Sequence, residues 1–187
     1  MGRSHDDVTS STPVALVLRD SVGMGPIIST TNPMEKRDAK VQPSHAAEEN
    51  TPKRITISGP DDYLAALSRI VFQSGMGRAV VDAKWNDIVA AFDNFAIKTV
   101  AQYGPDDIDR LCQDERVIRN RRKIEAIVHN ANVLDELEAD PGFSAWLRSH
   151  PDEMERDAAL IQRFKYLGPT GVPEFCWIVG EPTAQHR

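Results

Sequence analysis

Four cations fall within five positions at residues 119–123, where Arg119, Arg121, Arg122 and Lys123 stand at the predicted start of a helix. Cations at a helix N-terminus oppose the helix dipole, so this position favours a role outside helix stability, such as contact with an anion. The plainer alternative is a solvated face balanced by neighbouring acidic side chains, which is the usual role of such blocks.

A glycine-containing turn forms the second candidate site. Residues 164–170 read Phe-Lys-Tyr-Leu-Gly-Pro-Thr, between one predicted helix that ends near Arg163 and another that begins near Val172. A turn placed directly before a helix N-terminus can direct backbone N–H groups at one anion, and the helix dipole adds to the attraction. Gly168 permits close approach and Lys165 adds charge. The alternative is an ordinary connection with a left-handed glycine.

The third candidate site is residues 72–76, Phe-Gln-Ser-Gly-Met, at the end of an apolar run. Gln73 is a polar side chain where a helix is expected to stop. The alternative is a polar residue beside a helix end that is closed by Gly75 or Gly77.

Helical periodicity begins at Pro60 and continues to the last residues, with no strand pattern, so we predict an all-α fold. The expected helices are one with an apolar stripe over 63–71, one over 81–92, a short one at 95–100, one opened by Pro105, a long one from 124 to 137, short ones after Pro141 and Pro151, and a last one at 172–179. Residues 1–53 are rich in Ser, Thr, Pro and Asn, which predicts a mobile tail. We therefore place one domain at 58–187.

Composition limits the function classes. The net charge is −6. Residues 1–53 hold six of the 22 Lys/Arg and seven of the 28 Asp/Glu, so the remainder carries −5. A uniformly basic DNA-coating protein is excluded, whereas a local basic patch is not. Cys112 and Cys176 occupy apolar helix positions, which favours free thiols and a cytoplasmic location. No apolar run long enough for a membrane span is present, and the scattered histidines give no metal-ligand spacing.

The order of the three sites resembles the helix-hairpin-helix DNA glycosylases, most closely the DNA-3-methyladenine glycosylase I family, over about residues 61–180. The family's Gln-Ala-Gly-Leu is similar to Gln73–Met76, and its Ile-Ile-Arg-His-Arg-Gly-Lys-Ile is similar to residues 117–124, where Lys123 and Ile124 match directly. The resemblance implies an extruded base near Gln73, with Phe72 and Met76 as further pocket or wedge residues. It also implies DNA contacts from Lys165, Tyr166, Gly168, Thr170, Arg121, Arg122 and Lys123.

The chain departs from that family at the acids. Aligned without gaps from Gln73, the family's active-site Glu falls on Ile70, so the catalytic residue stays unknown. Asp82 and Glu181 are the carboxylates nearest the expected places. The family's Cys/His zinc site has no match, and the last helix carries Gly171 and Pro173 where the family has apolar residues.

Three hypotheses follow. The first is a monomeric DNA glycosylase of base-excision repair that binds duplex DNA and hydrolyses the N-glycosidic bond of an alkylated purine, without metal or cofactor. The second is a catalytically inactive DNA-binding or interaction protein, and the third is a small-molecule- or nucleotide-binding protein on the same scaffold.

Overall fold

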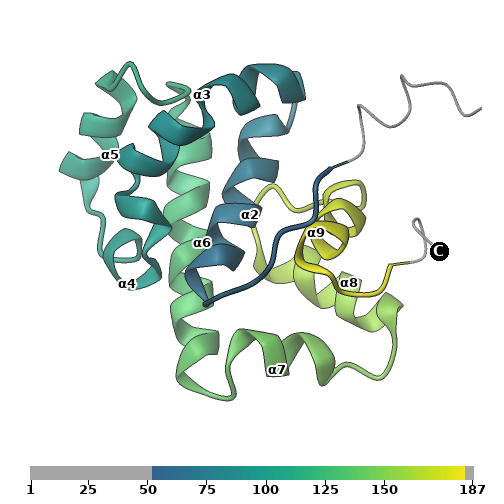
Figure 1. Cartoon of the computed structure of the whole chain (residues 1–187). Helices are drawn as coiled ribbons and strands as arrows, with labels where there is room; N and C mark the ends of the chain where they lie inside the picture. Colours follow the sequence, from purple (N-terminus) through teal and green to yellow (C-terminus); the bar gives the residue numbers. More distant parts are fainter. Residues whose placement is uncertain (1–51, 184–187) are drawn as a thin grey trace, which may run out of the picture. The chain divides into compact units, whose positions relative to one another are not determined.

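The computed structural model describes residues 52–183, and every regular element in that range is a helix, which confirms the all-α prediction (Figure 1). In chain order they are α2 (Asp61–Gln73), α3 (Arg78–Ala91), a 3-10 turn η1 (Asp93–Phe95), α4 (Ile97–Val100), α5 (Pro105–Gln113), α6 (Arg121–Ala139), α7 (Phe143–Arg148), α8 (Glu153–Arg163) and α9 (Gly171–Val179). None of the helices in this range is long and apolar enough to cross a membrane. Residues 1–51 of the predicted tail lie outside the described residues.

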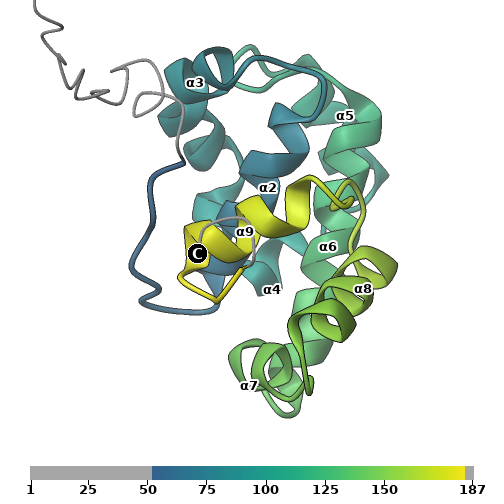
Figure 2. The ribbon, with the colours of Figure 1, turned by 90° about the vertical axis from the view of Figure 1, so that its right-hand side faces the viewer.

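The long helix α6 is the centre of the packing. It contacts α2, α4, α5 and α7, while α2 also contacts α3 and α9. In Figure 1, α2 and α6 lie side by side, with α3 to α5 on one side of them and α8 and α9 on the other; Figure 2 views the second side, where α9 lies beside α2. Because α2 contacts both α6 and α9, its C-terminal end is held between the predicted basic block and the predicted hairpin.

Aromatic side chains fill the core on both sides of α2. Phe72, Phe92 and Phe95 are fully buried, and the rings of Phe92 and Phe95 stack with centroids 5.2 Å apart. Phe143 is also fully buried and meets Tyr63 edge-on at 4.8 Å. Large buried aromatic surfaces contribute much of the apolar burial that stabilises a domain of this size, so both ends of α2 are firmly packed.

Polar residues at the helix starts explain several boundaries. Asn120 is the N-cap of α6 and accepts the Lys123 N–H through its side chain at 3.3 Å, and Asp152 caps α8 in the same way at 2.8 Å from the Glu155 N–H. Pro105 opens α5, as predicted, because its missing N–H is not needed in a first turn. These residues fix where α5, α6 and α8 begin.

A segment before α2 packs on α9. The Ile55 N–H donates to the Ile178 carbonyl at 2.9 Å, and the Trp177 indole N–H donates to the Pro52 carbonyl at 2.8 Å. The Arg54 guanidinium lies 3.9 Å from the centre of the Trp177 ring. Residues from 52 onward therefore contribute contacts to the helical domain, and the boundary at residue 58 stays a prediction.

Candidate functional site: a cavity between a helix end and a hairpin

Gln73 is the last residue of α2, as its pattern predicted. The chain reverses immediately afterwards: Gly75 has φ +70°, a conformation that glycine adopts at least cost, and the Met76 N–H donates to the Gln73 carbonyl at 2.9 Å. The two interpretations of this stretch are therefore compatible. A glycine closes the helix, and the Gln73 side chain stays partly exposed at its end.

Lys123 fixes this helix end from the neighbouring helix. Its side chain is only 6% exposed, and its ammonium donates to the carbonyls of Phe72 and Ser74, both at 2.7 Å. These two carbonyls flank Gln73, and a helix C-terminus attracts positive charge. Burial lowers the pKa of Lys123. The resemblance implied a DNA contact from Lys123; in the structure its ammonium faces the helix end and not the surface.

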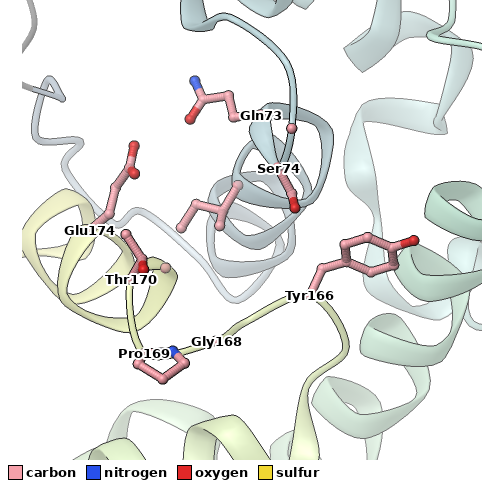
Figure 3. A pocket seen from close by; sticks show the side chains of 10 residues that line it. Gln73, Ser74, Tyr166, Gly168, Pro169, Thr170 and Glu174 are labelled. Carbon is pink, nitrogen blue, oxygen red and sulfur yellow. The ribbon is translucent and has the colours of Figure 1, made fainter. Parts of the chain in front are cut away.

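A cavity of about 400 Å³ opens beside Gln73. Its walls come from two places: the end of α2, and the connection from α8 into α9 with the first turn of α9 (Figure 3). The lining residues are Ile70, Gln73, Ser74, Gly75, Tyr166, Gly168, Pro169, Thr170, Gly171 and Glu174. Its volume lies within the range of roughly 300–1,000 Å³ that is typical of small-molecule sites. Two segments separated by about ninety residues of sequence thus form one site, and both were singled out from the sequence.

The turn at residues 164–170, here called the hairpin, offers unsatisfied donors to that cavity. The Gly168 carbonyl accepts the N–H groups of Gly171 and Val172, at 2.9 and 3.0 Å. Within the described chain, no protein acceptor is assigned to the N–H of Gly168 or of Thr170. Pro169 has no N–H, so the turn provides one donor fewer than its length would allow. A Cβ placed on Gly168 would meet nothing within 4 Å.

The left-handed residue of the hairpin is Tyr166, not a glycine. Its φ is +62° and the residue is 40% exposed, whereas the Gly168 backbone lies outside the left-handed region. A bulky residue with positive φ is uncommon and carries strain that the surroundings must offset. Asn130, a buried residue of α6, offsets it: its side chain accepts the Lys165 N–H at 2.8 Å and donates to the Lys165 carbonyl at 3.1 Å. The sequence analysis did not identify Asn130.

The basic block divides into three kinds of residue. Lys123 is buried at the end of α2. Arg121 pairs with Asp109 and lies 3.7 Å from Glu125. Arg119 and Arg122 are exposed and form no ion pair within residues 52–183. The block is therefore neither wholly a solvated, self-neutralised face nor wholly an anion site, and only two of its four cations are unpaired at the surface.

Two residues predicted for the pocket do not line it. Phe72 is 0% exposed and packs edge-on against Phe92, with centroids 6.0 Å apart, because it faces the core side of α2. Met76 is 36% exposed beyond the Gly75 turn and is outside the cavity wall. Of the three residues expected near an extruded base, Gln73 alone contributes to the cavity.

The carboxylate of the cavity is Glu174, which the sequence analysis missed. Glu181 is buried and pairs with Arg148 at 3.0 Å, away from the cavity, and Asp82 pairs with Arg69 at 2.6 Å. Asp82 lines a smaller neighbouring cavity of about 300 Å³ that shares Gln73 and Glu174. Ile70, where the resemblance places an acid, lines the main cavity with an apolar side chain.

No group of three or more His, Cys, Asp or Glu side chains suited to a metal ion occurs in residues 52–183. Cys112 and Cys176 are both free thiols; Cys176 is buried and Cys112 half-buried. Burial raises the pKa of the Cys176 thiol to about 12. These cysteines take no part in the cavity.

Comparison with known proteins agrees with this geometry. A family model described as methyladenine glycosylase matches residues 60–169. A crystal structure of 3-methyladenine DNA glycosylase I is 23% identical with a TM-score of 0.61, covering 72% of this chain and 86% of that one. A variant of such an enzyme in complex with 3-methyladenine is 23% identical with a TM-score of 0.60, covering 75% and 87%. The enzyme from Staphylococcus aureus is 25% identical with a TM-score of 0.59, covering 67% and 79%. Since the family model spans more than half of the sequence, this chain belongs to the methyladenine glycosylase family.

Proposed function

We propose that this protein binds duplex DNA through the hairpin, takes one extruded base into the cavity beside Gln73, and releases alkylated purines by hydrolysis. The observation that carries the proposal is that the hairpin and Gln73 line one cavity. Gly168 and Thr170, whose N–H groups have no acceptor among residues 52–183, line the same cavity as Gln73. A phosphate held by the hairpin and a base held in the cavity would then belong to one stretch of DNA strand.

The exposed cations support contact with a nucleic-acid backbone. Arg119 and Arg122 are unpaired at the surface within the described residues. Arg119 precedes α6 and Arg122 lies in its first turn, next to Lys123, which bonds the end of α2 that carries Gln73. An unpaired cation can contact a phosphate without first breaking a protein ion pair. Lys165 lies at the start of the hairpin and is exposed, so it adds positive charge beside the donors.

The chemistry favours a base that is already positively charged. In hydrolysis the bond between the sugar C1′ and the base nitrogen breaks, its electron pair passes to the base, and the oxygen of water bonds to C1′ as a proton leaves for the solvent. An N3-alkylated adenine carries positive charge and departs as a neutral base, so it needs little help from the protein. An uncharged base such as hypoxanthine needs protonation or strong stabilisation of the sugar cation. With Ile70 apolar, we expect slow release of cationic bases and none of hypoxanthine.

A second candidate is a DNA-binding protein without turnover. It is favoured by Ile70, because an isoleucine can neither hydrogen-bond a purine nor stabilise positive charge. The two candidates share the hairpin and the cavity and differ only in whether the glycosidic bond breaks.

One experiment tests DNA binding by the hairpin, which both candidates share. Gly168→Asp adds a negative side chain beside the N–H groups of Gly168 and Thr170, and a Cβ there would meet nothing within 4 Å, so it should abolish binding to a labelled duplex while leaving the melting temperature unchanged. Gly104→Asp is the matched control, since it adds the same charge at another glycine with open space, at the N-cap of α5. If Gly168→Asp binds DNA as the control does at moderate salt, the hairpin role is wrong.

Release of bases from alkylated duplex DNA separates the two candidates. The enzyme should liberate 3-methyladenine faster than a no-protein control and faster than Gly168→Asp. Binding without release would leave the DNA-binding candidate. Release of hypoxanthine by the unmodified chain would show that a catalytic group acts on the base in addition to the residues that line the cavity.

A further inference from the structure

Glu174 is the one charged side chain among the ten residues that line the main cavity. It lies on α9, one helical turn after Gly171, so the two residues share a face of that helix. The Gly171 position faces α2, because a Cβ added there would meet the Ile70 Cγ2 at 3.1 Å. Glu174 therefore points toward the end of α2, and Figure 3 shows it across the opening from Gln73.

The Glu174 carboxylate keeps its capacity to accept hydrogen bonds. The Arg78 Nη2 lies 3.0 Å from its Oε1, but this buried oxygen accepts no hydrogen bond from residues 52–183, so the pair is a charge contact. The side chain is 23% exposed, which leaves it reachable from the cavity. An ionised carboxylate is an acceptor only, with about four lone-pair sites. It therefore suits a ligand that offers N–H donors and positive charge.

We propose that Glu174 is the residue that selects a positively charged base in this cavity, in place of an acid at position 70; the inference rests on the base-binding role proposed above. An alkylated purine cation offers an exocyclic N–H and a full charge to the carboxylate, and charge-assisted hydrogen bonds are the stronger kind. An uncharged purine offers the same N–H without the charge.

The selection acts on binding more than on bond breakage. The positive charge leaves the base as the glycosidic bond breaks, so a carboxylate beside the base stabilises the bound lesion at least as much as the transition state. Replacing Glu174 should accordingly raise KM for a cationic lesion more than it lowers kcat.

Removing Arg78 tests the role of Glu174, because the two explanations of their pairing predict opposite changes in the affinity for a cationic base. It is the first residue of α3, and it neutralises Glu174 from outside the main cavity. If the carboxylate receives a cationic base, removing Arg78 takes away a competing cation and should tighten the binding of that base. If the pair only fastens α3 to α9, removing either partner should weaken binding alike.

The experiment uses purified full-length protein and two small probes without phosphate. The first, 3,9-dimethyladeninium, carries the charge of the lesion; the second, 9-methyladenine, is its neutral counterpart. Calorimetric titration should give a preference for the cation of about tenfold or more, the size expected of one charge-assisted hydrogen bond. Glu174→Gln should reduce this preference to near one, and Arg78→Gln should increase it. Asp82→Asn, in the neighbouring Arg69 pair, is the matched control and should leave it unchanged.

Three results would overturn the inference: an undiminished preference in Glu174→Gln, a parallel loss in Arg78→Gln, or failure of both probes to bind the wild type at millimolar concentration. Should Glu174→Gln not fold, Arg78→Gln alone decides by its sign. Because the probes hold no phosphate, these outcomes are independent of DNA binding, which the Gly168→Asp comparison measures separately.

Discussion

Exchanging Lys123 for methionine should separate the structural part of the basic block from its DNA-contacting part. The change keeps the length of the side chain and removes the ammonium that bonds the Phe72 and Ser74 carbonyls. Because Lys123 is 6% exposed, water cannot readily replace it at the Phe72 carbonyl, which is itself in a buried contact. The perturbation therefore leaves a helix end without its partner.

The loss of folding stability follows from the two hydrogen bonds that Lys123 no longer donates. A buried polar group left without a partner costs about 1–3 kcal/mol, and the more exposed Ser74 carbonyl regains part of its loss from water, so we expect a decrease of about 2–4 kcal/mol in the free energy of unfolding. Part of the lost stability is recovered, because methionine carries no charge that must be buried. The cost of burying that charge is seen in Lys123 itself, whose pKa is lowered by burial. Each kcal/mol corresponds to a decrease of roughly 2–8 °C in the melting temperature for domains of this size range.

Urea denaturation followed by circular dichroism measures this effect, with Arg122→Met as the control from the adjacent, exposed position. The control should change the free energy of unfolding by less than about 0.5 kcal/mol, as surface substitutions usually do. It should instead weaken DNA binding. A Lys123→Met protein as stable as the control would refute the assignment of Lys123 to the end of α2.

Three further predictions concern the surface, the segment before α2 and the cavity. Changing Arg119 and Arg122 to alanine should flatten the dependence of log affinity for DNA on log salt by roughly one unit per lost phosphate contact, and an unchanged slope would make them a solvated face. A chain that begins at residue 58 should melt below one that begins at residue 52, because it loses the Trp177 and Ile55 hydrogen bonds; equal melting temperatures would show that those contacts add nothing. Ile70→Glu should raise the release of 3-methyladenine from alkylated duplex DNA, and unchanged release would mean that the new carboxylate does not reach the base.

Patterns local in sequence predicted the fold well. The apolar stripe from Val81 to Phe92 became α3 and the residue after it, with Val81 and Ile88 fully buried, since helical spacing alone decides which face is apolar. Pro105 correctly marked the first turn of α5. The long helix was also expected, although it begins at Arg121 rather than three residues later, because the cap at Asn120 is polar and leaves no mark in the apolar period.

Contacts between distant segments could not be predicted in the same way. Lys123 reaches a carbonyl 51 residues away, and nothing in its own neighbourhood distinguishes it from Arg122. Phe72 and Gln73 are adjacent, and only the packing of α2 decides that the first faces the core and the second the cavity. Glu174 lies in the last helix, for which the resemblance implied no site residue, so the resemblance gave no reason to select it.

The charge of the cavity depends on how α9 meets α2. Gly171 lets the first turn of α9 approach so closely that an added Cβ would lie 3.1 Å from Ile70, and the isoleucine fills the space beside the glycine. The same contact brings an apolar residue at 70 and a carboxylate one turn beyond 171 into the wall of one cavity. A chain with carboxylates at both 70 and 174 would place two like charges on one cavity wall, and one of them would hold its proton more tightly. The gain from Ile70→Glu should therefore be larger when Glu174 is already glutamine. Equal gains in the two backgrounds would mean that the two positions do not face one ligand.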